Sequence, residues 1–184
     1  NDSSLVERAE IIMEKGTDRS KFFRGEVDKY TWVDLGSSYL MNEMTAAFLW
    51  AQLEEAENIT AHRLELWNQY DRAFASLEQK GLLRRPMIPQ SCERHNGHIY
   101  YILLNTPQAR DALMGNLKKE GALSVFHYIP LDTSLAGQTY ATTGGDLMHT
   151  EDLAARLLRM PLFCDLLETE QVISCVQKSI IHCY

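Results

Sequence analysis

The stretch "HIYYILLNTPQARDALMGNLKKEGALSVFHYI" (residues 98–129) decides the fold, because it predicts a strand, a helix and a second strand in succession. Its beginning, residues 98–104, is mostly aromatic or aliphatic, a composition typical of strands. Thr106 and Pro107 then predict the start of a helix. A threonine side chain can accept from the free N–H groups at a helix start, and proline fits the first helical position.

This helix is expected to run to about residue 120, with Gly121 as the residue that ends it. A second apolar run, residues 123–129, predicts a strand that Pro130 stops. In the helix that precedes Gly121, the helical spacing of the apolar residues predicts one buried face. That face comprises Ala109, Ala112, Leu113 and Leu117.

The rest of the C-terminal half continues the alternation of helices and strands. Residues 132–148 are rich in glycine and threonine, and we expect them to form the most flexible part of the chain. A helix is expected over 150–159, a short strand over 160–163, and a last helix capped by Thr169. Residues 85–184 are therefore predicted to form a compact α/β domain. The apolar stripe of the last helix comprises Val172, Ile173, Val176 and Ile180.

Upstream, the chain is predicted to begin with a helix over residues 5–15. Ser4 and Glu7 have the spacing of a capping box, and Gly16 is a stop signal. Residues 17–38 show no period but carry several large aromatic rings, so we expect an ordered loop there.

Two longer helices are predicted between this loop and the α/β domain. Asn42 is the expected N-cap of a helix over 43–57, whose first turns, 44–51, are apolar on every side. Such a helix is typically buried between two layers, so we expect the chain to self-associate. A second helix is expected over 60–80, ended by Gly81. Its apolar face comprises Leu64, Trp67, Tyr70, Phe74 and Leu77.

The overall composition excludes several classes of protein. The net charge is −7, and lysine and arginine are scattered, which argues against a nucleic-acid-binding surface. No run approaches the roughly 18 apolar residues of a membrane span, and no signal peptide is recognisable. The four cysteines form no CxxC pair and no metal-ligand pattern, so we expect reduced thiols and no metal site. These features predict a cytoplasmic protein without nucleic-acid or membrane partners.

Two places in the sequence could carry chemistry. His127 and Tyr128 end a predicted strand just before Pro130. The pair supplies two hydrogen-bonding groups, and a histidine side chain can take up or release a proton near neutral pH. The alternative is that His127 is merely hydrogen-bonded at the edge of the sheet. Ser37 and Ser38 precede a predicted helix, whose N-terminus would attract anions. The alternative is that these two hydroxyls only satisfy the turn.

Several stretches resemble one enzyme family. The longest is "EKGTDRSKFFRGEVDKYTWVDLGSSYLMNEMTAAFLWAQLE" (14–54), supported by "VFHYIPL" (125–131), "AGQTY" (136–140) and "RLLRMPLF" (156–163). They resemble the PLP-dependent nucleotide-sugar aminotransferases of the DegT/DnrJ/EryC1 type. The first stretch is closest to the branch that serves the synthesis of enterobacterial common antigen.

The resemblance implies the C-terminal part of a fold-type-I aminotransferase that works as a homodimer. Residues 1–42 would be the end of the large PLP domain, 43–84 the long connecting helices, and 85–184 a small α/β domain with a short, mainly antiparallel sheet. The implied reaction transfers an amino group from L-glutamate to TDP-4-oxo-6-deoxy-D-glucose. Because residues 1–57 have too little alternating structure to close a core, we expect the chain to be a piece of a longer protein.

The resemblance also implies site residues. In the family, an asparagine in a Gly-Tyr-Asn-Tyr-Arg loop reaches the PLP phosphate of the neighbouring subunit. Ser38 stands at that position here, and Leu40 replaces the arginine. His127 and Tyr128 match a His-Tyr pair near the nucleotide sugar, which implies substrate binding. His98 matches a family histidine without a defined role.

The family's catalytic lysine lies in a Ser-x-His-x-x-Lys motif upstream of the first helix. None of the seven lysines here has that context, so no catalytic residue is assigned in this chain and none of them replaces the Schiff-base lysine. We therefore expect the chain alone to be inactive and not to bind PLP by itself. The alternative reading is a non-catalytic α/β module that binds a partner or a small ligand.

Overall fold

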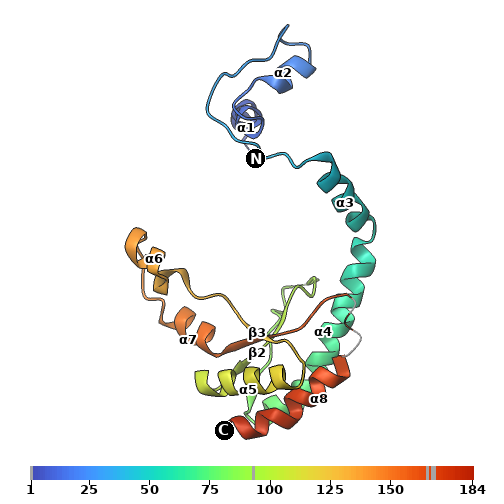
Figure 1. Cartoon of the computed structure of the whole chain (residues 1–184), viewed down its shortest axis with the longest axis vertical. Helices are drawn as coiled ribbons and strands as arrows, with labels where there is room; N and C mark the ends of the chain where they lie inside the picture. The colour runs from blue at the N-terminus through green and yellow to red at the C-terminus, as the bar shows by residue number, and fades with distance from the viewer. Residues whose placement is uncertain (1, 93, 165, 167–168) are drawn as a thin grey trace. The chain divides into compact units, whose positions relative to one another are not determined.

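The computed structural model describes residues 2–92, 94–164, 166 and 169–184 (Figure 1). Its internal contacts divide the chain into two units, residues 1–56 and 57–184. Among the described residues, no helix is both long and apolar enough to cross a membrane.

The first unit is helical and lacks a capping box at Ser4. It contains η1 (Ser3–Leu5), α1 (Val6–Met13), α2 (Arg19–Phe23) and α3 (Glu43–Glu54). The carboxylate of Asp2 accepts both the N–H and the hydroxyl of Ser4, so the Ser4 hydroxyl is already engaged. Leu5 precedes α1 without a side-chain cap, and the predicted capping box is therefore wrong.

The loop after α1 is held against the end of that helix by backbone pairing. Gly16 has φ +77° and donates its N–H to the carbonyl of Ile11 at 2.8 Å, which confirms it as the residue that ends the helix. Isolated β-bridges join Glu14 to Ser38 and Thr17 to Trp32. The predicted loop 17–38 also contains α2, whose short helix the sequence pattern did not indicate.

Helix α3 begins where the sequence predicted. Asn42 accepts the N–H of Thr45 at 2.9 Å, which confirms it as the N-cap. The helix ends at Glu54, and α4 (Ala56–Gln79) starts four residues earlier than expected. Within this chain the expected burial of α3 is absent, since Met44, Phe48 and Trp50 are 85%, 72% and 66% exposed.

The second unit is an antiparallel sheet packed with helices, as expected for its fold class. The strands are β1 (Leu83–Arg84), β2 (Tyr100–Leu104), β3 (Val125–Phe126) and β4 (Leu157–Met160), in the order β1-β2-β4-β3. Every neighbouring pair is antiparallel, and Tyr100 pairs with Met160. The helices are α4, α5 (Pro107–Lys119), η2 (Leu131–Thr133), α6 (Leu135–Tyr140), α7 (Met148–Arg156), α8 (Thr169–Ser179) and η3 (Ile180–Cys183).

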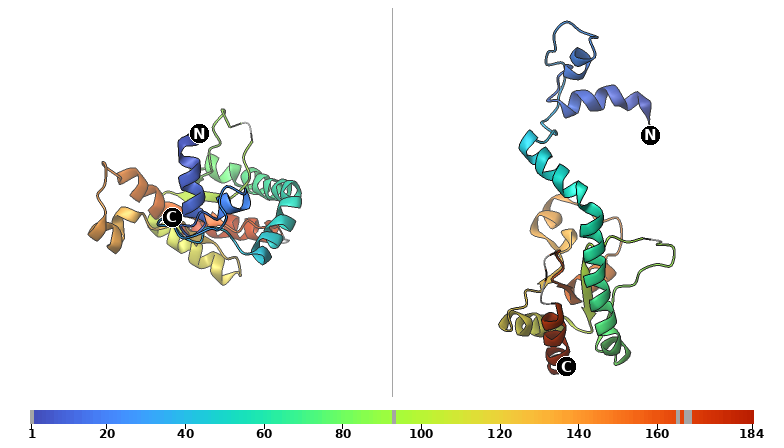
Figure 2. Two further views of the ribbon diagram at one scale, coloured as in Figure 1. Left: turned by 90° about the horizontal axis from the view of Figure 1, so that it is seen from above. Right: turned by 90° about the vertical axis from the view of Figure 1, so that its right-hand side faces the viewer.

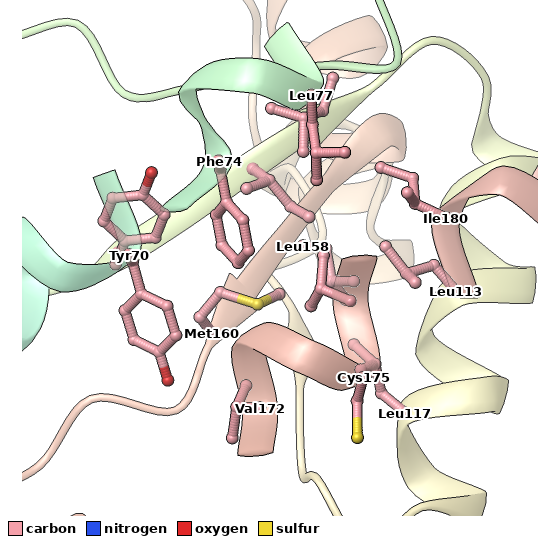
Figure 3. Packing of buried hydrophobic residues seen from close by; sticks show 14 of the residues in the cluster. Tyr70, Phe74, Leu77, Leu113, Leu117, Leu158, Met160, Val172, Cys175 and Ile180 are labelled. Carbon is pink, nitrogen blue, oxygen red and sulfur yellow. The ribbon is translucent and has the colours of Figure 1, made fainter. Parts of the chain in front are cut away.

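The core of this unit joins the sheet to α4, α5 and α8. The side chains of Tyr70 and Phe74 from α4 lie beside Met160 of β4, and Val172 of α8 lies on the same side (Figure 3). Helices α5 and α8 run side by side in the views of Figures 1 and 2. Because α4 shares this core, the second unit begins near residue 57 and includes the second of the two long helices.

The start of α5 was predicted correctly. The Thr106 hydroxyl accepts the N–H of Ala109 at 3.1 Å, and Pro107 is the first helical residue. Ala112 is exposed, so its assignment to the buried face is wrong, whereas Ala109, Leu113 and Leu117 are buried. The strand expected over 123–129 is limited to β3, because only two of its residues pair with β4.

Two further expectations differ from the structure, and the glycine- and threonine-rich excursion contains a helix that the sequence did not indicate. The excursion 132–148 contains α6, capped by the Ser134 hydroxyl, which accepts the N–H of Gly137. The strand expected over 160–163 is β4, so the preceding helix α7 ends at Arg156. Thr169 is the first residue of α8. Its buried hydroxyl has no hydrogen-bond partner among the described residues, so its role as a cap is wrong.

Candidate functional site

Ser38 lies beside the end of α1 and not at the start of α3. The N–H of Ser37 donates to the carbonyl of Ile12 at 2.9 Å, and Ser38 forms a β-bridge with Glu14. Four residues separate Ser38 from Glu43, the first residue of α3. The expectation that its hydroxyl belongs to a helix N-terminus is therefore wrong, because a different helix end lies next to it.

A small basic pocket surrounds Ser38 instead. It has a volume of about 200 Å³ and lies entirely in the first unit. No partner for the Lys15 ammonium is found among the described residues, and Lys15 has φ +62°, a conformation that non-glycine residues rarely adopt. The Arg19 Nε lies 3.7 Å from a carboxylate oxygen of Glu14, an ion pair without a hydrogen bond. The lining residues are Met13, Glu14, Lys15, Thr17, Arg19, Tyr30, Ser38 and Leu40.

The donors of this pocket suit an anion. Two cations and three side-chain hydroxyls, those of Thr17, Tyr30 and Ser38, line it, against one carboxylate. A phosphate monoester takes hydrogen bonds on several oxygens and is favoured by nearby cations. The residues present therefore fit a phosphate group.

His127 and Tyr128 lie directly after β3, in the segment that leads to α6 and α7 (Figure 1). Their rings meet edge to face, with 5.1 Å between the ring centres. His127 is half-buried, and its Nδ1 is buried without a hydrogen-bond partner among the described residues. The Tyr128 side chain is 77% exposed. No hydrogen bond of the His127 ring is found among the described residues, so the structure does not support the alternative of an edge histidine held by a hydrogen bond.

Two cavities border this segment. One, of about 410 Å³, is lined by His127 and Tyr128 together with Arg110, Thr133 and Glu151. The other, of about 840 Å³, is bordered by the same His127 and Tyr128 but otherwise by almost only apolar side chains. Both lie within the second unit, so residues 127 and 128 line both a recess that contains charged side chains and a more apolar one.

Sequence reasoning identified His127 and Tyr128 but missed the charged residues around the two sites. Arg110 belongs to the first turn of α5, and Glu151 belongs to α7. Lys15 follows the end of α1, and Arg19 is the first residue of α2. The predicted start of α5 could have placed Arg110 at that end of the helix, but only the packing of α5 against α7 brings it to the cavity.

Other groups that the sequence analysis considered lie elsewhere. His98 is exposed, and its carbonyl accepts a hydrogen bond from the Arg63 guanidinium. The ring of His95 packs against Trp67, with 4.8 Å between ring centres. Within the described residues, no cluster of three potential metal-ligating side chains occurs.

Comparison with solved structures identifies the fold. An aminotransferase, TlmJ, from Streptoalloteichus hindustanus superimposes with a TM-score of 0.83 at 22% identity, over 100% of this chain and 47% of that one. The Helicobacter pylori aminotransferase PseC, involved in the biosynthesis of pseudoaminic acid, gives 0.81 at 22% identity, over 99% and 47%. The chain therefore has the fold found in part of these aminotransferases.

The sequence comparisons add the family. The DegT/DnrJ/EryC1/StrS aminotransferase family matches residues 1–178, and the chain belongs to this family. One relative, the dTDP-4-dehydro-2,3,6-trideoxy-D-glucose 4-aminotransferase of Saccharopolyspora spinosa, is 26% identical over 98% of this chain and 47% of its own length. The chain spans about half the length of the relatives that it matches.

Proposed function

We propose that this chain is the C-terminal part of a PLP-dependent aminotransferase that transfers an amino group from L-glutamate to TDP-4-oxo-6-deoxy-D-glucose, in the synthesis of enterobacterial common antigen. The family match over residues 1–178 carries this proposal. The Saccharopolyspora relative supports the substrate class, since its name describes amination at position 4 of a dTDP-linked keto sugar.

The chain's part in the reaction is to bind and position. Bound PLP would stabilise the negative charge that develops on the amino-bearing carbon during proton transfer. Ser38 would donate its hydroxyl to the cofactor phosphate held by the neighbouring subunit of a homodimer. Lys15 and Arg19 would supply positive charge in the same pocket, and their positions beside Ser38 support this role.

His127 and Tyr128 would contact the nucleotide sugar. Their position on the wall of the cavity of about 410 Å³ supports this role. The lysine that moves the proton is expected upstream of residue 1. We therefore propose that the chain alone is inactive.

The proposal can be tested by titration with PLP followed by absorbance. One sample is the chain of residues 1–184, and the other is a longer chain that carries the upstream lysine motif. The absorbance change that marks attachment of PLP to a lysine is expected only in the longer chain. Glutamate should reverse that change, and TDP-4-oxo-6-deoxy-D-glucose should restore it. A longer chain that never attaches PLP would contradict the proposal and favour a non-catalytic binding module.

The role of Ser38 has its own readout. In the longer chain, Ser38→Ala should weaken retention of PLP by about tenfold, the effect of one charge-assisted hydrogen bond. Ser38→Asn should restore retention, because its amide can also donate. Ser37→Ala is the matched control and should retain PLP normally. Loss of PLP from the Ser37 variant, and not from the Ser38 variant, would assign the phosphate contact to Ser37 instead of Ser38.

A further inference from the structure

Helix α7 forms one wall of both cavities that border residues 127 and 128. Glu151, Ala154 and Ala155 line the cavity of about 410 Å³, and Leu153 and Ala154 line that of about 840 Å³. No residue of this helix is buried, since each is half-buried or exposed. A helix without a buried face gains little stability from the apolar core. The position of this wall therefore depends on the polar contacts of the helix.

The guanidinium of Arg156 makes such contacts at the last residue of α7. Its Nη1 donates to the carbonyl of Leu104, at the end of β2, over 2.8 Å. Its Nε donates to one carboxylate oxygen of Asp152 over 2.9 Å, and its Nη2 donates to the other oxygen. The Arg156 side chain is only 16% exposed, so water competes little for these bonds. One planar group thus joins the last turn of the helix to the sheet.

The sheet offers a rigid anchor for this contact. Leu104 is fully buried, and β2 lies between β1 and β4. The pairing of β2 with β4 ends at Leu103 and Leu157, so the Leu104 carbonyl lies one residue beyond the last pair. The next residue, Asn105, donates its N–H to the hydroxyl of Tyr184 at 3.1 Å. Arg156 therefore bonds α7 to a part of the sheet that is itself held on other sides.

The place of Arg156 in α7 lets it control the direction of the whole helix. The helix has nine residues and is therefore about 13 Å long. Strand β4 begins at the next residue, so α7 leaves the sheet where Arg156 is bonded. A small rotation at this point moves Glu151, near the other end, further than it moves Arg156. Loss of the Arg156 contacts would consequently displace the wall of the cavities.

We propose that Arg156 is a positioning residue for the substrate recess. Its guanidinium bonds Asp152 and the Leu104 carbonyl at the same time, and this fixes the direction of α7. The α7 wall of the recess is thereby kept in place beside His127 and Tyr128. The inference rests on the proposed function, because it takes the cavity of about 410 Å³ as part of the nucleotide-sugar site.

Enzyme kinetics of the longer chain test the positioning role. Arg156→Lys keeps the charge, but an ammonium group cannot replace the planar fork that bonds two partners. Its KM for TDP-4-oxo-6-deoxy-D-glucose should rise about tenfold, while kcat and the KM for glutamate stay unchanged. Arg72→Lys, at an exposed arginine of α4, is the matched control and should keep all three constants. A merely structural role would lower the amount of folded enzyme, and so the apparent kcat, without changing either KM.

Hydrogen exchange in the chain of residues 1–184 tests the contact without cofactor or activity. The N–H groups of Glu151 and Leu157 each donate to the carbonyl four residues earlier. Both should exchange about 10- to 100-fold faster in Arg156→Gln, which removes hydrogen bonds of a charged group. Amides of α8 should keep their wild-type rates. Asp152→Asn leaves the bond to the sheet in place and should show a smaller increase. Arg156→Lys is measured in the same way if the Gln variant does not fold.

The results separate this inference from the proposed function. In an active longer chain, an unchanged KM for the nucleotide sugar in Arg156→Lys would overturn the inference. Faster exchange in every helix would also overturn it, because that would show a general loss of stability. An inactive longer chain would reject the proposed function, and faster exchange confined to α7 would then still support the role of Arg156 in holding this helix.

Discussion

Gly36 packs directly against the backbone of Gly16. A Cβ added to Gly36 would lie 2.2 Å from the Gly16 nitrogen and 2.8 Å from the carbonyl oxygen of Ile12. No side chain fits at those distances without moving the backbone. This close approach lets the loop lie along the end of α1, where Ser38 pairs with Glu14. The position of the Ser38 hydroxyl therefore depends on a residue two positions before it.

Gly36→Ala should destabilise the first unit by about 1–3 kcal/mol, the usual cost of forcing an extra methyl group into a packed site. The neighbouring atoms are backbone atoms, which cannot rotate away. Hydrogen exchange measures the effect at the amides of Ser37 and Tyr39, which donate to α1 carbonyls. Both should exchange faster in the variant.

Gly144→Ala is the matched control, since nothing lies within 4 Å of a Cβ added there. It should leave the exchange of both amides unchanged. Unaltered protection in the Gly36 variant would mean that the loop tolerates the methyl group and that the close approach does not fix Ser38.

Local signals in the sequence predicted the elements better than the way they pack. Asn42 and Thr106 were identified as caps because a cap involves only neighbouring residues, and both are confirmed. Ser4 was misassigned because the carboxylate of Asp2, two residues earlier, accepts the Ser4 N–H that the Glu7 side chain would accept in a capping box. Residues 157–159 were misread as helix, since pairing with β2, far away in the sequence, makes them part of a strand.

For the candidate sites too, the sequence showed what is local and did not show what depends on tertiary packing. His127 and Tyr128 are adjacent in the sequence, so their association was visible there. Arg110 reaches the same cavity from α5, and Glu151 reaches it from α7. No local pattern links these helices. Only the tertiary packing shows that their charged side chains line one recess.

Alkaline pH should unfold the second unit through its buried tyrosines. Tyr70 and Tyr100 are fully buried, and burial raises the pKa of both hydroxyls well above the ordinary value of about 10. The folded state therefore holds these protons more tightly than the unfolded state. The stability associated with them is complete below about pH 10 and is lost as the pH rises further. Tyrosinate absorbance should appear together with the loss of circular dichroism.

Tyr70→Phe provides the control for this prediction. The Tyr70 hydroxyl donates to the carbonyl of Pro161 at 2.9 Å, so the variant should lose about 0.5–1.5 kcal/mol at neutral pH. It should also show a shallower loss of stability at alkaline pH, because one buried titrating group is gone. Ionisation of all tyrosines in the folded protein before any unfolding would contradict the prediction.

Acid should weaken the attachment of β1 to α4. The backbone N–H of Arg85 donates to Glu78 at 2.7 Å, and its guanidinium donates to Glu78 at 2.8 Å and to Asp71 at 2.7 Å. The backbone hydrogen bond, followed by the side-chain hydrogen bond and charge of Arg85, lowers the pKa of Glu78. Its stabilising contribution is present above the ordinary glutamate pKa of about 4.3 and is lost as the pH falls through the lowered value.

Glu78→Gln should lower the denaturation midpoint at neutral pH and reduce the loss of stability between neutral and acid pH. Glu65→Gln, an exposed carboxylate on the same helix, is the control and should keep the wild-type acid profile. Urea unfolding at several pH values measures both. Parallel pH profiles for the Glu78 variant and the wild type would show that another carboxylate controls the acid transition.

The exposed apolar surface of α3 should drive association of the chain. Phe48 and Trp50 are 72% and 66% exposed, and the helix carries further apolar residues on its other sides. Burying a large apolar side chain contributes about 1.5–3 kcal/mol, so a contact between two copies is favourable.

Sedimentation at increasing concentration should show a dimer. Phe48→Ser should weaken it by about 10²- to 10⁴-fold, since the side chain is removed from both copies. Gln52→Ser, an exposed polar residue of the same helix, should leave the equilibrium unchanged. A monomer at every concentration would contradict this prediction and would show that the α3 surface does not bring copies of this chain together.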